Sequence, residues 1–331
     1  MAIGFLLFFM ITPPCLVFIW ASLRFSGLLQ KWKRSRIPKS ALACPSNWTH
    51  SSDSKGHDFA SLESVPEAFK TAVQHLVAST FKRVRTRDRR GCRLASHLEV
   101  VEVQRIESRA MWERYARARY EVKLRRDDCE RFGEWAGGEP LTWALGDPFR
   151  KFCQNDLGVE LQEELNEVYL WHGTSPESVR GILEGGFNLQ LAGSGAGCMF
   201  GKGVYLAECS SKSDEYSSAR AELPGVYCVL LCRAILGKVY RVTEGTRATL
   251  REIQRNLDNG EYDSVLGDRQ AARGTYREFV VYSDEHVYPE YMVLYKRCFP
   301  SPRDDGVGEE GRVHMPKLSS LRATHGCQHW V

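Results

Sequence analysis

After Val168 the chain is divided into short apolar runs separated by glycine-rich and polar stretches, and this pattern constrains the fold most strongly. The runs cover residues 168–171, 203–207, 226–235, 278–282 and 291–295. Apolar runs of this length, bounded by turn residues, are typical of strands. With one or two short helices between them, they predict an α+β domain built on curved, mostly antiparallel sheet. A doubly wound nucleotide fold is excluded, because no Gly-x-Gly-x-x-Gly leads from a strand into a helix.

The part of the chain before Val168 predicts further elements. Apolar residues recur at helical spacing over residues 64–80 and predict an amphipathic helix. A β-branched run over 98–103 predicts the first strand, and the charged stretch from Met111 to Arg126 predicts a second helix. Glycine, tryptophan and proline are frequent over 134–148, which we expect to form a loop.

These patterns divide the chain into four parts. Residues 1–36 begin with an apolar segment, and residues 37–60 are polar and serine-rich, as expected of a linker. We expect one folded domain over residues 61–300 and a polar tail over 301–331.

The apolar segment over residues 2–23 is long enough to cross a bilayer, and basic residues from Lys31 to Arg36 follow it. As a membrane anchor, with basic residues on that side alone, it would leave the rest of the chain facing the cytosol. A cleaved signal peptide is one alternative, although the segment has no positive n-region and no clear A-x-A site. A mispredicted start codon is another. Without an anchor, we expect the protein in the cytoplasm or nucleus.

Charge and cysteine content exclude several classes of site. The net charge is +4, too small to indicate nucleic-acid binding. The basic run over residues 82–93 contains no aromatic side chain that could stack on bases, so we expect a solvated loop or helix end and no nucleic-acid partner. Eleven cysteines without a C-x-x-C pair form neither a disulfide framework nor a zinc site, and we expect free thiols and no metal.

Three short segments place chemically active side chains near the ends of predicted strands. In the first, residues 169–174, a strand ends at His172 and Gly173, and the glycine lets a ligand approach the main chain. Taken alone, such a histidine is more often structural than functional.

The second segment runs from Met199 to Tyr216. Two glycines flank a lysine, Tyr205 follows in an apolar strand, and serines then suit the start of a helix. Ser213 and Tyr216 are three residues apart and face the same way on a helix, so one can hydrogen-bond a ligand while the other stacks on it. Alone, the pattern equally fits a core tyrosine and a surface serine.

In the third segment, residues 277–282, Glu278 is the one carboxylate among β-branched and aromatic residues. A carboxylate beside a buried run is unfavourable unless it is paired or used, which makes Glu278 a candidate catalytic group. Glu285 and Glu290, in more polar surroundings, are expected at the surface.

In this order and at these separations, the three segments resemble the catalytic domain of the poly(ADP-ribose) polymerase family. The resemblance runs from about Val101 to Arg297. It looks closest to the tankyrases, in Trp112–Tyr115, Met199–Gly201 and Leu231–Arg233, although their zinc-binding insert and ankyrin repeats have no counterpart here. The mono-ADP-ribosylating members of the family share several of these features.

The resemblance implies an ADP-ribosyltransferase fold and NAD+ as the donor. It further implies a catalytic triad of His172, Tyr205 and Glu278. His172 would hold the adenosine ribose, and Tyr205 would line the nicotinamide pocket. Glu278 would stabilise the positive charge that develops at the anomeric carbon as the bond to nicotinamide breaks, as in glycoside hydrolysis.

The remaining donor contacts implied by the resemblance lie beside the triad. The main chain of Gly173 would clamp the nicotinamide carboxamide with help from the Ser213 hydroxyl. Tyr216 would stack on the nicotinamide ring, and Thr174, where the family often has serine, would contact the donor as well.

The expected activity is transfer of ADP-ribose to protein acceptors with release of nicotinamide. A glutamate at position 278 slightly favours elongation to oligo- or poly-ADP-ribose, because relatives with another residue there generally transfer one unit. Mono-ADP-ribosylation and a non-catalytic scaffold that binds NAD+ or ADP-ribose remain the alternatives.

Overall fold

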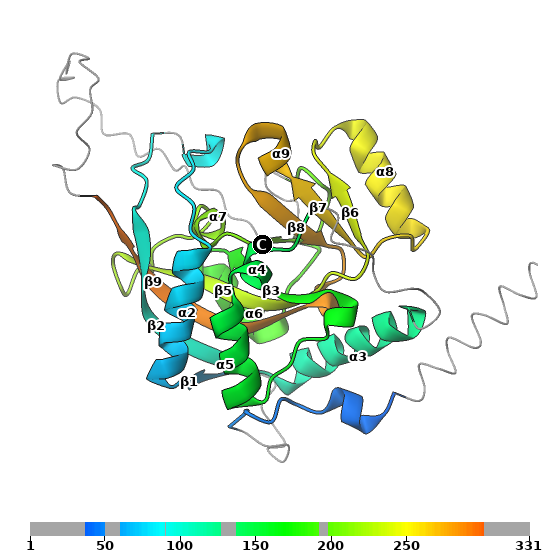
Figure 1. Ribbon diagram of the computed structural model, residues 1–331, viewed down its shortest axis with the longest axis horizontal. Coiled ribbons are helices and arrows are strands. Elements are labelled where there is room, and N and C mark those ends of the chain that lie inside the picture. Colours follow the sequence, from blue (N-terminus) through cyan, green and yellow to red (C-terminus); the bar gives the residue numbers. More distant parts are fainter. Residues whose placement is uncertain (1–36, 50–59, 90, 127–136, 192–197, 301–331) are drawn as a thin grey trace, which may run out of the picture. The chain divides into compact units, whose positions relative to one another are not determined.

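The computed structural model describes residues 37–49, 60–89, 91–126, 137–191 and 198–300 (Figure 1). The chain divides into two compact units, Met1–Ala43 and Cys44–Val331. The described part of the first holds the short 3-10 helix η1 (Lys39–Leu42). The apolar segment 2–23 and the tail 301–331 lie outside the described residues. Within the described residues, no helix has both the length and the apolar character needed to span a bilayer.

The second unit is organised around one open sheet, which among the described residues has nine strands. Neighbouring strands are antiparallel throughout, except for the parallel pair β6 and β7, so the predicted α+β fold with a mostly antiparallel sheet is confirmed. In spatial order the strands are β1 (Ser61–Ser64), β2 (His97–Glu107), β9 (Val287–Cys298), β5 (Val226–Ile235), β3 (Glu167–Gly173), β4 (Val204–Ala207), β8 (Arg277–Val281), β7 (Ser264–Asp268) and β6 (Val239–Val242).

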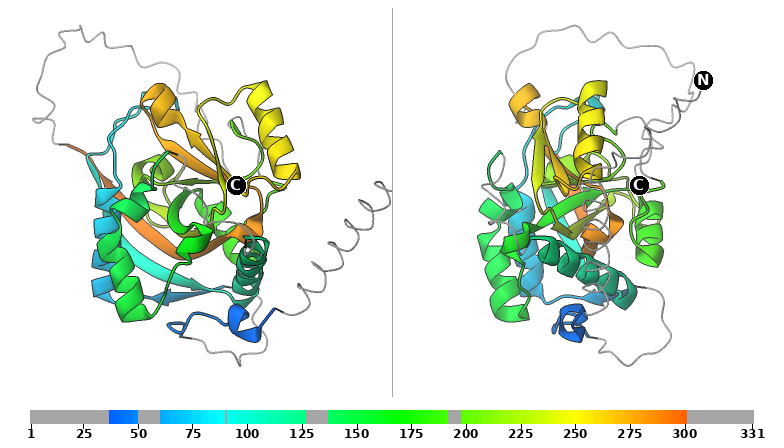
Figure 2. Two further views of the ribbon diagram at one scale, coloured as in Figure 1. Left: turned by 45° about the vertical axis from the view of Figure 1, so that its right-hand side comes forward. Right: turned by 90° about the vertical axis from the view of Figure 1, so that its right-hand side faces the viewer.

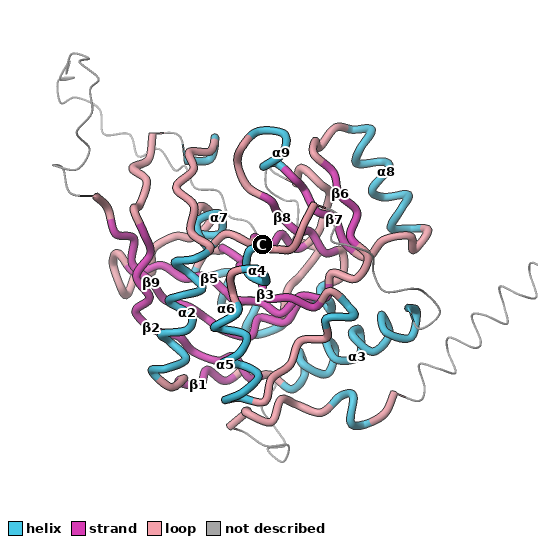
Figure 3. Tube along the Cα trace, in the orientation of Figure 1, coloured by secondary structure: helices cyan, strands magenta, loops and turns pink. Residues whose placement is uncertain are grey.

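The helices of this unit pack around the sheet. Helices α2 and α5 lie side by side against β2, β9 and β5, while α8 lies beside β6 and β7 at the other end (Figures 1 and 3). The bounds are α2 (Glu67–Ser79), η2 (Arg87–Arg89), α3 (Arg109–Arg126), α4 (Leu141–Ala144), α5 (Asp147–Leu157), η3 (Glu163–Leu165), α6 (Pro176–Gly185), α7 (Ser210–Asp214), α8 (Arg247–Asp258), α9 (Arg269–Arg273) and η4 (Asp284–His286).

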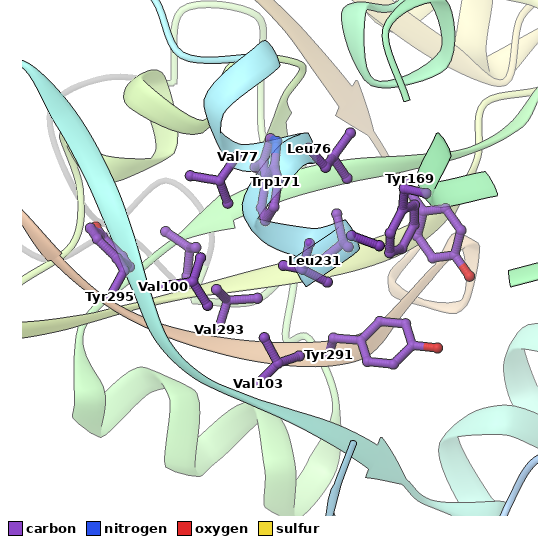
Figure 4. Packing of buried hydrophobic residues seen from close by; sticks show 14 of the residues in the cluster. Leu76, Val77, Val100, Val103, Tyr169, Trp171, Leu231, Tyr291, Val293 and Tyr295 are labelled. Carbon is purple, nitrogen blue, oxygen red and sulfur yellow. The ribbon is translucent and has the colours of Figure 1, made fainter. Parts of the chain in front are cut away.

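The larger hydrophobic core fills the space between α2, α5 and the sheet. Leu76 and Val77 of α2 meet Trp171 and Leu231 there (Figure 4). Trp171 is fully buried, and its indole N–H donates to the hydroxyl of Thr80 over 3.2 Å. Because side chains alternate along a strand, Trp171 faces this core and His172 faces the opposite side of the sheet. Figure 2 shows α6 on that opposite side.

A second core cluster lies at the other end of the sheet. It joins Phe200, Val242, Ile253 of α8, Val265 and Val280, all buried. Strand β3 contributes Trp171 to the first cluster and β8 contributes Val280 to the second, and β4 pairs with both strands between them.

Three expectations about local structure were wrong. The run over 98–103 was expected to form the first strand, but it lies in β2, and β1 precedes it. Residues 134–148 were expected to be a loop, yet they contain α4 and the start of α5. Pro140 precedes α4 and Pro148 lies in the first turn of α5, where proline is compatible with a helix because no backbone donor is needed there. More than two short helices also follow Val168, namely α6, α7, α8 and α9.

Glu290 was expected at the surface and is instead fully buried. Arg233 donates to both of its carboxylate oxygens, over 2.9 and 3.1 Å. Such a bidentate pair satisfies a charge that could not otherwise be buried. Within the predicted linker 37–60, Trp48 packs against Trp112 and Tyr288 at ring distances of 6.0 and 6.2 Å.

Phe69→Ala tests how strongly α2 depends on its contact with the sheet. Phe69 is fully buried, with ring centroids 4.7 Å from Tyr291 and 5.5 Å from Phe149, so its removal should lower the free energy of unfolding by about 3–5 kcal/mol. Denaturant unfolding followed by circular dichroism measures this. Thr71→Ala, exposed on the same helix, should change stability by less than about 0.5 kcal/mol. Equal effects of the two substitutions would contradict the prediction.

Candidate active site

Three adjacent strands bring the predicted catalytic residues together. Ala207 of β4 pairs with Trp171 of β3 on one side and with Glu278 of β8 on the other. His172 and Glu278 therefore flank the strand that carries Tyr205. Helix α7, which supplies Ser213, contacts β3 directly.

His172 is held as a neutral ring with one unused acceptor. Its Nδ1 lies 3.0 Å from the carbonyl oxygen of Tyr205, and since a carbonyl can only accept, Nδ1 carries the proton. Nε2 is then an acceptor, and it is buried without a hydrogen-bond partner among the described residues. Burial lowers the pKa of His172 to about 4, which keeps the ring neutral near pH 7. Phe187 packs edge-on against the ring at 5.0 Å.

Gly173 allows α7 to approach the end of β3. A Cβ atom at position 173 would lie 1.8 Å from the carbonyl oxygen of Ser213, far inside van der Waals contact. No residue other than glycine fits there without displacing α7. Ser213 and Thr174 are both buried beside this contact.

The hydroxyl of Tyr205 is occupied by the turn that precedes its strand. It accepts from the backbone N–H of Phe200 and donates to the carbonyl of Gly201, each over 2.9 Å. The hydroxyl of Tyr282 donates to the carbonyl of Phe200 over 2.5 Å. Gly201 has a φ of +97°, so this turn requires glycine. Tyr205 thus fixes the shape of the 199–201 turn.

A buried lysine, Lys212, connects Tyr216, which was expected to stack on the nicotinamide ring, with three carboxylates including that of Glu278. Nζ of Lys212 donates to the hydroxyl of Tyr216 over 2.7 Å and to Oε2 of Glu215 over 2.9 Å. It also lies 3.7 Å from Oε1 of Glu278 and 3.8 Å from Oδ2 of Asp88. Burial alone lowers the pKa of Lys212, but Glu278, Tyr216 and Glu215 outweigh it, and the pKa is raised. The ammonium is therefore held charged.

Glu278 keeps 17% of its side chain exposed, more than Lys212 and Glu215 but less than Asp88. Burial raises its pKa, Lys212 acts in the opposite direction, and Glu215 and Asp88 raise it further. Its charge thus depends on Lys212.

The neighbour of Glu278 anchors the start of β8. Arg277 donates to both carboxylate oxygens of the fully buried Glu208, over 3.0 and 2.5 Å. Glu208 also accepts from the backbone N–H of Leu141, and Arg277 donates to the carbonyl of Glu139 over 2.8 Å. This pair fixes the backbone from which Glu278 projects.

Helix α7 is fixed in turn through Asp214. This fully buried carboxylate accepts from the hydroxyl of Tyr295 over 2.5 Å, from Nε of Arg297 over 2.7 Å, and from Arg89. Arg297 also donates to the carbonyl of Ser217 over 3.1 Å. The C-terminal end of α7 is therefore bonded to β9.

Sequence reasoning missed Lys212, Glu215 and Asp88. Lys212 stands inside the Ser-Ser-Lys-Ser segment, and its position one residue before the candidate site residue Ser213 was a usable signal in the sequence. In the structure its side chain is buried. Asp88 was hidden in the basic run 82–93, and its contact with Tyr216 joins residues 128 positions apart. No local pattern could have revealed that contact.

The chain is similar in sequence to known ADP-ribosyltransferases. The model of the poly(ADP-ribose) polymerase catalytic domain matches residues 78–297. Human protein mono-ADP-ribosyltransferase PARP14 is 24% identical over 79% of this chain and 11% of its own length. Mouse protein mono-ADP-ribosyltransferase PARP12 is 29% identical over 44% of this chain and 19% of its length. Tankyrase of Caenorhabditis elegans is 26% identical over 40% of this chain and 7% of its length.

The chain belongs to the poly(ADP-ribose) polymerase catalytic-domain family. It spans less than a fifth of the length of each of these three relatives. The tankyrase is no more similar than the mono-ADP-ribosyltransferases, so the similarities do not distinguish the two groups. The residues fit an NAD+ site in one respect: the buried Nε2 of His172, which has no hydrogen-bond partner among the described residues, can accept from a hydroxyl group of the donor. Among the described residues, no group of three His, Cys, Asp or Glu could hold a metal ion.

The lowered pKa of His172 predicts a pH dependence of stability. Between pH 6.5 and about 4 the unfolded chain binds a proton at this residue that the folded chain does not, so stability should fall as the pH drops. The loss attributable to His172 is about 3 kcal/mol. Denaturant unfolding of the wild type and His172→Gln across this range measures it. Parallel stability profiles would contradict the prediction, while the buried His286 is present in both proteins.

Proposed function

We propose that this protein transfers ADP-ribose from NAD+ to protein acceptors and releases nicotinamide. The observation that carries the proposal is the partly exposed carboxylate of Glu278, which lies 3.7 Å from the buried ammonium of Lys212. His172 lies next to the end of β3, and β4 separates β3 from the strand that carries Glu278. Membership of the family supports it. We further propose that residues 61–300 form the catalytic unit, because β1 begins at Ser61 and pairs with β2.

We assign each residue of the site a role in this reaction. Nε2 of His172 accepts from a ribose hydroxyl of the donor, and the Gly173 main chain and Ser213 bind the carboxamide. Tyr216 provides the ring that stacks on nicotinamide. Glu278, as an anion, stabilises positive charge at the anomeric carbon and accepts the proton of an incoming acceptor hydroxyl.

Product length is a finer proposal. Glu278 can polarise a ribose hydroxyl of ADP-ribose already attached, which favours elongation to oligo- or poly-ADP-ribose. Two of the relatives compared carry names as mono-ADP-ribosyltransferases, so mono-transfer is the specific alternative.

Incubation of the full chain with labelled NAD+, followed by gel separation, tests the activity. A ladder or smear is expected for elongation and a single band for mono-transfer. Glu278→Gln should lower transfer by about 10²–10³-fold, because the charge that stabilises the transition state is lost. The matched control is Glu285→Gln, an exposed carboxylate nearby in sequence, which should leave transfer unchanged. NAD+ binding without any labelled product would instead support the non-catalytic scaffold.

Lys212→Met tests the electrostatic coupling to Glu278. Because Lys212 opposes the raised pKa of Glu278, its removal should raise that pKa further. Activity needs the ionised carboxylate, so the acidic limb of the pH profile of kcat/KM should move to higher pH. NAD+ hydrolysis across the pH range measures the limb, with the exposed Lys238→Met as control. An unmoved limb would show that Lys212 does not set the charge of Glu278.

A further inference from the structure

A strongly charged segment is bonded to helix α7, and its exposed arginines have no role in the chemistry described so far. Five of the eight residues 82–89 are Lys or Arg, and one is acidic. We call residues 82–89 the basic segment. Arg83, Arg85 and Arg87 are exposed, whereas Arg89 is buried in its ion pair with Asp214.

The basic segment is fixed to α7 and the turn that follows it. The backbone N–H of Lys82 donates to the hydroxyl of Ser211 over 3.0 Å, and the hydroxyl of Thr86 donates to Glu215 over 2.6 Å. The hydroxyl of Tyr216 donates to Asp88 over 3.2 Å. The exposed arginines take no part in these contacts, so they can be replaced without removing the attachment.

A second set of contacts joins the basic segment to the elements that carry Glu278. The hydroxyl of Tyr276, two residues before Glu278, donates to the carbonyl of Lys82 over 3.0 Å. Nζ of Lys82 donates to the side chain of Gln270 in α9 over 2.9 Å. The segment therefore borders the site along both α7 and β8.

The positive charge of this border is largely unneutralised. Among the described residues Arg83 has no ion-pair partner, and Arg85 donates to the backbone carbonyl of Cys92. Arg87 has Asp88 at 3.6 Å, but Asp88 also serves Lys212 and Tyr216. The exposed guanidinium groups thus present an excess of positive charge to solvent on a segment that is bonded to α7 and to Tyr276.

The chemistry of this border favours an acidic protein segment over a nucleic acid. Single-stranded nucleic acids are held by aromatic stacking together with charge, and residues 82–89 contain no aromatic side chain. A net charge of +4 for the whole chain also falls short of a general nucleic-acid binder. Exposed arginines suit carboxylates, which they can bind in a bidentate manner.

We propose that the basic segment is the docking surface for the acceptor, and that it selects protein segments rich in Asp and Glu. This substrate class rests on the proposed function, because an acceptor must place its nucleophile near Glu278. Arg83 and Arg85 attract the acidic residues that flank the acceptor side chain, which raises the local concentration of acceptor at the site.

Binding of a labelled peptide tests the proposal without requiring catalysis. The probe is a fluorescein-labelled peptide of alternating glutamate and glycine, with a glutamine counterpart as the neutral probe, and anisotropy is measured on the full chain without NAD+. The double variant Arg83→Glu, Arg85→Glu should weaken binding of the acidic peptide by about tenfold. Added salt should weaken wild-type binding and remove most of the difference. Arg83→Gln, Arg85→Gln should give a smaller loss in the same direction.

The matched control is Arg251→Glu, Arg255→Glu, which makes the same charge change at exposed positions of α8. Equal weakening by both double variants, or equal binding of the acidic and neutral peptides, would overturn the proposal. Tighter binding of a single-stranded oligonucleotide than of the acidic peptide, lost in the Arg83, Arg85 variant, would overturn it in favour of a nucleic acid.

NAD+ hydrolysis separates this proposal from the proposed function. The variant Arg83→Glu, Arg85→Glu should keep the wild-type KM for NAD+ when no acceptor is added. A raised KM would mean that these arginines bind the donor, and the docking proposal would fail. Absence of NAD+ cleavage by the wild type would refute the proposed function alone, because peptide binding is measured independently.

Discussion

The contact between Gly173 and the backbone of Ser213 is the constraint on which the site depends. Helix α7 has five residues, too few to be stable alone, so its position is set by what it touches. Gly173 lets it lie directly against the end of β3, and the contacts of Asp214 with Arg297 and Tyr295 hold its last turn to β9. Helix α7 carries Lys212, and the basic segment is bonded to α7 and to the turn after it. Displacement of this short helix would therefore disturb all of these contacts together.

Several ion pairs balance the charge around Glu278. Lys212 lies within 4 Å of the carboxylates of Glu215, Glu278 and Asp88, and Arg89 also pairs with Glu215. Under the proposed function this balance suits the reaction, since positive charge develops on the ribose as nicotinamide leaves. Burial raises the pKa of Glu278, but Lys212 lowers it and so favours the ionised form, whose negative charge would stabilise the transition state.

The elements that the sequence predicted well are those whose pattern is local. Helix α2, and the strands that contain Trp171, Tyr205 and Glu278, each follow from periodicity or from a short apolar run. The convergence of His172 and Glu278 on β4 was implied by resemblance alone, since strand order is not a local property. Glu290 was misjudged for the same reason, because its partner Arg233 lies 57 residues away on a neighbouring strand. The prediction for Glu290 failed because its burial depends on an ion pair with a residue that is distant in the sequence.

The pattern of buried charge explains why Glu278 differs from the other carboxylates of the sheet. Glu208 and Glu290 are fully buried, and each accepts two hydrogen bonds from one arginine. Displacement of either side chain would leave a buried carboxylate without its partner. Glu278 keeps part of its surface exposed, and its nearest cation is 3.7 Å away, beyond hydrogen-bond distance. The carboxylate of Glu278 projects from a fixed strand but has no lysine or arginine within hydrogen-bond distance among the described residues, so it can interact with positive charge on a bound molecule. The tightly paired glutamates therefore fix the strand, and the loosely paired one is available for chemistry.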